Sequence, residues 1–236
     1  MRVNMLTGVA GAVGVAAGSV AWGQVSLHST LNIVNGQTYN RMDFDTKGNP
    51  DAAMTVDDVT FASSVIVTDV TLDYLSTSGL APADGVELHF YASGGGMPGP
   101  LVASLHVGIS DLSVTNWTDT VFGVGLKGTR VTADNPDFVL AAGTYWVGMV
   151  AEDYSGGDTY YSVREYQTLG TSQVFGRDIW GSAHFGGGGS WVQLLSPAPG
   201  SMNSMEIRGY VVPGPGASAL ALAGLGWGVR RKRGEC

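Results

Sequence analysis

The chain has 236 residues, 44% of them hydrophobic, and a formal net charge of −8. Residues 24–211 hold 7 of its 12 basic and 19 of its 20 acidic residues, so this part alone carries a charge of −12. Binding to a phosphate backbone needs clustered Lys and Arg, so the composition excludes a nucleic-acid partner. The 36 glycines and the scarcity of Lys, Glu and Gln favour strands joined by turns over helices.

The first 23 residues predict an export signal. Arg2 provides a positive start, Met5 to Val20 is an uncharged run, and Ala21–Trp22–Gly23 places small residues before a cleavage site. This order is typical of a secretory signal peptide. We therefore expect cleavage between Gly23 and Gln24, and a mature protein outside the cytoplasm.

The first strand is expected from Val25 to Ile33, where apolar residues alternate with polar ones. An acidic loop follows this strand. Asp43, Asp45 and Asp51 begin like a calcium loop, but Lys47 stands at the fifth position and Met54 at the twelfth, where oxygen ligands are required. Two interpretations stay open, a calcium site and a solvated polar turn. Two further clusters of acidic residues could also bind an ion, but their spacing is equally unspecific as a calcium motif. These are Asp57–Asp58, and Glu152–Asp153 with Asp158.

A long strand is expected from Val65 to Leu75, and a hairpin after it. The apolar phase of the long strand shifts near Thr68–Asp69, which indicates a bulge. Val86–Tyr91 and Leu101–Val107 both alternate with period two, and the Gly/Pro-rich segment between them must turn.

The hairpin places two histidines on one outward face. His89 and His106 would neighbour Glu87 and Ser104 there, and two imidazoles with a carboxylate could hold zinc. Histidine on an exposed strand face is also commonplace, so the pattern permits both interpretations.

Two more strands complete the expected sheets. Tyr145–Ala151 has apolar residues at both odd and even positions, as a strand buried on both faces does. Met205 and Ile207 alternate with Glu206 and Arg208 in the closing strand. No G-x-S-x-G nucleophile motif is present, and the spacing of the acidic residues neither supports nor excludes a glycosidase carboxylate pair. We do not expect an enzyme.

The segment 176–191 is the most distinctive loop, because it combines a run of glycines with Trp180 and Trp191. Exposed aromatic rings stack on sugar faces, so these tryptophans are candidates for glycan binding. The alternative is that Trp191 begins a core strand and Trp180 covers a sheet edge.

The last 25 residues predict a sorting signal. A hinge, Val212–Pro213–Gly214–Pro215, is followed by the apolar run Ala217–Val229 and the basic block Arg230, Arg231, Lys232 and Arg233. The run is shorter than the about 20 residues that span a bilayer, and the basic block would stay on the cytoplasmic side. We expect a transient stop in the membrane.

This tail resembles the PEP-CTERM class of bacterial sorting signals, with Gly214 in the place of the glutamate that gives the class its name. The resemblance implies processing by a membrane enzyme of the exosortase type. The segments Val56–Phe61, Val70–Tyr74, Val86–Tyr91 and Leu140–Val147 are similar, in their order, to the β-sandwich ectodomains that often precede such tails.

We therefore expect an all-β protein. Its centre would be an antiparallel, jelly-roll-like β-sandwich at residues 24–211, flanked by a signal peptide at 1–23 and a short hydrophobic sorting helix within 212–236. The expected function is that of an exported protein of the cell envelope, cell surface or extracellular matrix. The alternative is a carbohydrate-binding module or glycan-active enzyme with extracellular polysaccharide as its partner. No cofactor is expected, apart from calcium if the acidic loop binds it.

Overall fold

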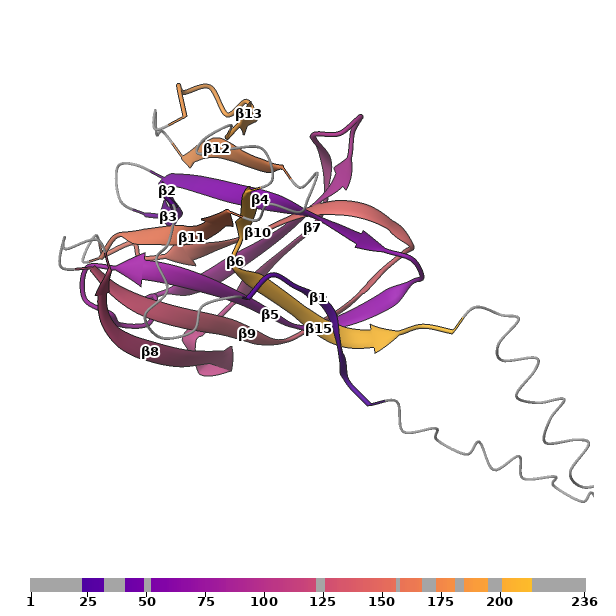
Figure 1. Ribbon diagram of the computed structural model, residues 1–236, viewed down its shortest axis with the longest axis horizontal. Coiled ribbons are helices and arrows are strands. Elements are labelled where there is room, and N and C mark those ends of the chain that lie inside the picture. The colour runs from indigo at the N-terminus through magenta and orange to yellow at the C-terminus, as the bar shows by residue number, and fades with distance from the viewer. Residues whose placement is uncertain are drawn as a thin grey trace, which may run out of the picture.

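The computed structural model describes residues 23–31, 41–48, 52–121, 126–155, 158–166, 173–180, 185–194 and 201–213. These residues form two antiparallel sheets, with one short parallel pair between β3 and β10 (Figure 1). The eight-stranded sheet contains β1 (Val25–Ser29), β2 (Arg41–Phe44), β5 (Val65–Ser76), β8 (Leu112–Val121), β9 (Leu126–Leu140), β11 (Tyr160–Tyr166), β14 (Ser201–Asn203) and β15 (Met205–Val211).

The second sheet has seven strands. They are β3 (Thr46–Lys47), β4 (Ala52–Phe61), β6 (Gly85–Ser93), β7 (Pro98–Val107), β10 (Gly143–Glu152), β12 (Val174–Trp180) and β13 (Val192–Gln193). The helical structure among the described residues is a single 3₁₀ turn, η1 (Ile109–Asp111). The expected all-β class is thus confirmed.

The main hydrophobic core lies between the sheets. It takes Val67, Val70 and Leu72 from β5 and alternate residues of β6 and β10, which point to the same side because successive side chains of a strand face opposite ways. Tyr74, fully buried on β5, donates its hydroxyl hydrogen bond to the carbonyl of Met149 on β10 and so links the two sheets.

A second core covers the opposite face of the seven-stranded sheet, which we call the outer face. Its buried residues are Met54, Val56, Tyr91, Trp146, Val150 and Phe175, with Ile179 and Trp191 packed against them. Strand β10 is therefore apolar on both sides. It lies between β4 and β6, which confirms the expectation of a strand buried on both faces.

The expected bulge and hairpin are also present. The pairing register of β5 with β9 shifts between Val67 and Asp69, where the apolar phase changes in the sequence. Strands β6 and β7 pair as the predicted hairpin. The first strand ends at Ser29, and Ile33, expected at its end, lies outside the described residues.

The ends of the described domain lie together. Strand β1 pairs antiparallel with β15, so that Val25 is opposite Gly209 (Figure 1). Strand β15 also pairs with β5 on its other side, where Val211 lies opposite Val65. The last strand of the domain is thus an interior strand of its sheet.

Candidate functional site

A pocket of about 490 Å³ opens on the outer face of the seven-stranded sheet. Strands β3, β6, β7 and β12 line it with Lys47, Glu87, His89, Tyr91, Gly99, Pro100, Leu101, Arg177 and Ile179. We call it the outer-face pocket. It combines charged groups, an imidazole, a phenol and apolar walls, and its volume lies within the about 300–1,000 Å³ that is usual for small-molecule sites.

The period-two pattern of the hairpin builds one wall of the pocket. Val86, Leu88 and Phe90 of β6 enter the main core, so Glu87 and His89 must point to the outer face. In the pairing with β7, Glu87 lies opposite His106 and His89 opposite Ser104. The sequence therefore predicted correctly that these four residues are neighbours on one face.

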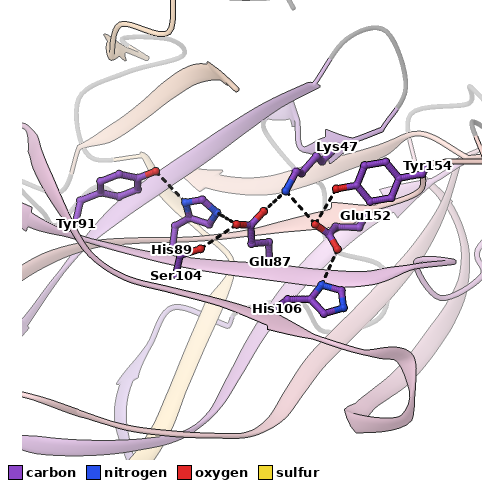
Figure 2. Close-up of polar contacts among 8 residues, drawn as sticks. All are labelled: Lys47, Glu87, His89, Tyr91, Ser104, His106, Glu152 and Tyr154. Carbon is purple, nitrogen blue, oxygen red and sulfur yellow. Dashed lines mark hydrogen bonds and ion pairs between the residues drawn. The ribbon is translucent and has the colours of Figure 1, made fainter. Parts of the chain in front are cut away.

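Lys47 is the centre of the charge network beside the pocket (Figure 2). Its ammonium forms an ion pair with Glu87 and lies 3.1 Å from Oε1 of Glu152. Burial alone would lower the pKa of Lys47, but the hydrogen bonds to Glu87 and Glu152 outweigh it and raise the pKa. Although burial opposes it, the hydrogen bond from Lys47 lowers the pKa of Glu87. Lys47 and Glu87 are thus both charged at neutral pH.

The two histidines contact different carboxylates. His89 Nε2 lies 3.0 Å from Glu87 Oε1, whereas His106 Nδ1 lies 2.7 Å from Glu152 Oε2 (Figure 2). The other ring nitrogen of His89 is 2.9 Å from the hydroxyl of Tyr91. Burial lowers the pKa of His89 despite the carboxylate of Glu87, so its imidazole is neutral at neutral pH.

The remaining polar groups of the network satisfy the carboxylates. The Ser104 hydroxyl donates to Glu87 at 2.9 Å, and the Tyr154 hydroxyl donates to Glu152 at 3.2 Å (Figure 2). The Lys47 ammonium lies between the two carboxylates. Within the described ranges, no three His, Cys, Asp or Glu residues form a group that could hold a metal.

Of the three calcium candidates, the structure describes the side chain of Asp45. Asp45 is fully buried and accepts hydrogen bonds from the backbone amide and the hydroxyl of Thr55, the latter at 2.9 Å. Asp43 belongs to β2, opposite Ser162, and Asp51 lies outside the described residues. The calcium site therefore stays a prediction.

The other acidic candidates have structural partners. Asp57 accepts the amide of Asn203 at 2.7 Å in the buried region between the sheets. Asp153 accepts the amides of Ser155 and Asp158 at 3.1 and 2.7 Å and so shapes its own turn.

Aromatic residues form the far side of the pocket. The ring of Trp191 packs edge-on against Tyr91, with centroids 4.9 Å apart and an angle of 82°. The guanidinium carbon of Arg177 lies 5.5 Å from the centre of the Trp191 ring, within the range of a cation–π contact. Trp191 is thus partly buried between a core residue and a cation, and Trp180 is the last residue of β12.

The glycine loop is attached to β12 by Asp178. This buried carboxylate accepts the amides of Phe185 and Gly187 at 2.9 and 2.7 Å. Gly187 has a φ of 78°, in the left-handed region that favours glycine. The loop thereby carries Trp191 back onto the sheet beside Arg177.

The predicted processing sites lie at the joined ends of the domain. The side-chain amide of Gln24 donates to Thr68 at 2.7 Å, and also to Asp69. Val212 and Pro213 line a separate apolar pocket of about 370 Å³ with Ile66, Tyr210 and Val211. Gly214, Pro215 and the block Arg230–Arg233 lie outside the described residues.

Sequence reasoning missed the parts of the site that come from outside the hairpin. Lys47 was considered only as a departure from a calcium loop, Glu152 only as a member of an acidic cluster, and Arg177 was not singled out. One signal was available for Arg177, because it is one of only 7 basic residues in the domain and adjoins the tryptophan-rich loop.

A comparison with known protein families gives no match, and no curated protein sequence matches the chain. In the part of the chain that the structure describes, there is no helix with the length and hydropathy needed to cross a bilayer. The apolar run at 217–229 is not in that part.

Proposed function

We propose that this is an exported protein of the cell envelope or extracellular matrix, whose tail is processed by an exosortase-type enzyme. Its domain is a jelly-roll-like antiparallel β-sandwich without catalytic activity. Residues 1–23 direct export, and residues 212–236 hold the protein transiently in the membrane until processing.

The pairing of β1 with β15 supports this proposal. The strand that follows the predicted signal peptide lies beside the strand that precedes the predicted sorting motif, with Val25 opposite Gly209. The two strands that adjoin the predicted processing sites are therefore neighbours in the eight-stranded sheet. The outer-face pocket belongs to the other sheet, so a domain held at these strands leaves its pocket open to the surroundings.

Cell fractionation tests the sorting proposal. Three chains are compared in the native bacterium: the full chain, a chain that ends at Val211, and a chain with Arg230–Arg233 replaced by serines. We expect the full chain in the envelope or matrix at a mass that shows loss of both ends. The truncated chain should be released into the medium, and the serine variant should keep its tail. Unchanged location and mass in both variants would contradict the proposal.

A second candidate function is carbohydrate binding at the outer-face pocket. The pocket offers hydrogen-bonding groups on Glu87, His89 and Tyr91 beside the apolar side chains of Leu101 and Ile179. Sugars present hydroxyl groups at their rims and C–H groups on their faces, so this mixture is complementary to a sugar ring. The tryptophan predicted from the sequence, Trp191, contributes by supporting Tyr91 and Arg177 rather than as an open platform.

The ionised state of Glu87 suits it to accept hydrogen bonds and not to act as the general acid of a glycosidase. A glycosidase needs one carboxyl group whose pKa is raised, so that it holds a proton for the leaving group. The pKa of Glu87 is instead lowered, because Lys47 and Ser104 donate hydrogen bonds that outweigh the effect of burial. Glu87 is therefore suited to accept hydrogen bonds from sugar hydroxyls.

A glycan array probed with the exported protein tests this candidate. Leu101→Asp should abolish binding, because it places a charge on the apolar wall of the pocket. Val102→Asp is a matched control: both side chains belong to β7 and are half exposed, at 49% and 51%, but only Leu101 lines the pocket. Binding that both variants retain, or that both lose, would argue against this pocket as the glycan site.

A further inference from the structure

Arg177 differs from Lys47 and Arg130, the two basic residues that form ion pairs with carboxylates in the described part of the chain. Lys47 is paired with Glu87 and Glu152, and Arg130 forms a two-pronged contact with the buried Asp73 at 2.7 and 3.0 Å. Arg177 lines the outer-face pocket, and no described carboxylate forms an ion pair with it. Its Nε is buried and has no hydrogen-bond partner in the described part of the chain.

The surroundings hold the guanidinium in place without neutralising it. The guanidinium carbon of Arg177 lies 5.5 Å from the centre of the Trp191 ring. The guanidinium nitrogens Nε and Nη2 lie next to Gly189 of the glycine loop. His89 and Tyr91 are close enough for the charge of Arg177 to act against proton binding on each of them. A cation that is already oriented but unpaired is a preorganised anion site, because its side chain loses little conformational entropy when an anion binds.

The charge of the pocket contrasts with that of the domain. Its lining contains two cations, Lys47 and Arg177, and one carboxylate, Glu87. Lys47 is shared by Glu87 and Glu152, whereas Arg177 forms no ion pair with a described carboxylate. The domain around it carries −12 over residues 24–211 and repels anions in general. Only an anionic ligand with further contacts in the pocket would overcome that repulsion.

We propose that the outer-face pocket binds an acidic saccharide, with the carboxylate of a uronic-acid unit on Arg177. A planar guanidinium receives a carboxylate through two parallel hydrogen bonds, which fixes the orientation of the sugar. The neutral imidazole of His89 and the carboxylate of Glu87 then face the hydroxyl groups, and Pro100 and Leu101 face the apolar side of the ring. This inference rests on the proposal that the pocket binds carbohydrate.

Calorimetric titration of the exported protein tests the inference with three ligands of equal length. These are an oligomer of uronic acid, the same oligomer with its carboxyl groups reduced to alcohols, and a sulfated neutral oligomer. We expect the uronic-acid oligomer to bind most tightly. Reduction of its carboxyl groups should weaken binding about 10- to 100-fold, which is the range for loss of a hydrogen bond to a charged group.

Two variants and one control assign the effect to Arg177. Arg177→Gln should weaken binding of the acidic oligomer about as much as carboxyl reduction does, and it should not weaken binding of the reduced oligomer further. Arg177→Lys keeps the charge but cannot donate two parallel hydrogen bonds to a carboxylate. Its affinity for the acidic oligomer should therefore lie between those of the wild type and Arg177→Gln. Arg208→Gln is the matched control, because Arg208 is exposed on β15 of the other sheet. Unchanged thermal unfolding shows that each variant is folded.

The outcomes separate the two proposals. Equal affinity of the wild type for the acidic and the reduced oligomer would overturn the carboxylate assignment and leave carbohydrate binding intact. Tighter binding of the sulfated oligomer would also overturn it, in favour of a sulfate site. Binding of none of the three oligomers would overturn both proposals. The comparison of ligands on the wild type is decisive even if a variant fails to fold.

Discussion

Two carboxylates face each other on the eight-stranded sheet at the bulge of β5. Asp69 lies directly opposite Asp134 in the pairing with β9. Burial raises the pKa of Asp69, and the neighbouring Asp134 raises it further. A carboxyl group whose folded-state pKa is raised binds its proton more tightly when folded, so stability is lost as the pH rises through that value. At neutral pH the ionised carboxylate of Asp69 therefore opposes folding.

Asp134→Asn should consequently stabilise the protein at neutral pH. Like charges directly opposite on neighbouring strands destabilise by roughly 0.2–1 kcal/mol, so we expect the free energy of unfolding to rise by about 0.5 kcal/mol at pH 7. Urea denaturation at pH 7 and pH 3.5 measures it, and the gain should shrink at the lower pH, where Asp69 binds its proton. Asp111→Asn in the exposed turn η1 is the control. A gain that does not depend on pH would refute this explanation.

Strand β10 carries a glycine, Gly148, at a position where a side chain would collide with β4. A Cβ atom on Gly148 would lie 2.4 Å from the carbonyl oxygen of Thr55 and 2.8 Å from Cγ1 of Val56. The carbonyl cannot move freely, because Thr55 is held in β4 opposite Gly176 of β12. The absence of a side chain therefore lets β4 approach β10 beneath the outer face.

Gly148→Ala should destabilise the protein by about 1–3 kcal/mol, the usual effect of forcing an extra carbon into a packed core. Gly108→Ala is the matched control, because its Cβ would meet nothing within 4 Å and its φ of −70° suits alanine. Urea denaturation of the two variants gives the comparison. If both variants have the same free energy of unfolding, β4 and β10 can move apart to make room for the added methyl group at no cost in stability, and the explanation is wrong.

The elements that sequence predicted well are those whose evidence is local. The hairpin of β6 and β7 and the bulge at Thr68–Asp69 follow from the alternation of neighbouring residues, which the sheet preserves. The site depends on residues from distant parts of the chain. Lys47 meets Glu87 across 40 positions and Glu152 across 105, and no spacing rule predicts that meeting.

The position of Trp191 was likewise open from the sequence. Its predicted roles, a sugar platform or the start of a core strand, depend on which side of the ring is covered. That is decided by Tyr91 and Arg177, which come from two other strands.

On the scale of the whole domain, partly buried histidines couple stability to pH. Burial lowers the pKa of His28, on β1, and of His89, on β6, from the usual 6.5. Each binds its proton more weakly when folded, so its contribution to stability is complete above pH 6.5 and is lost as the pH falls below it.

We expect the free energy of unfolding to decrease between pH 7.5 and pH 5.5. Replacement of both His28 and His89 by glutamine should reduce that decrease, because glutamine does not titrate. Urea denaturation of the wild type and the double variant across this range measures the effect. An identical pH dependence in both proteins would show that other groups are responsible.

The interior position of β15 determines how the domain would respond to pulling. A terminal strand at a sheet edge is peeled away one hydrogen bond after another, whereas β15 has β1 on one side and β5 on the other. Tension applied at Val211 acts along β15, across hydrogen bonds that run perpendicular to the strand on both sides. Those bonds share the load in shear. If the domain is attached to a surface through its C-terminal end, flow or swelling of the surrounding matrix would strain the attachment before it unravelled the fold.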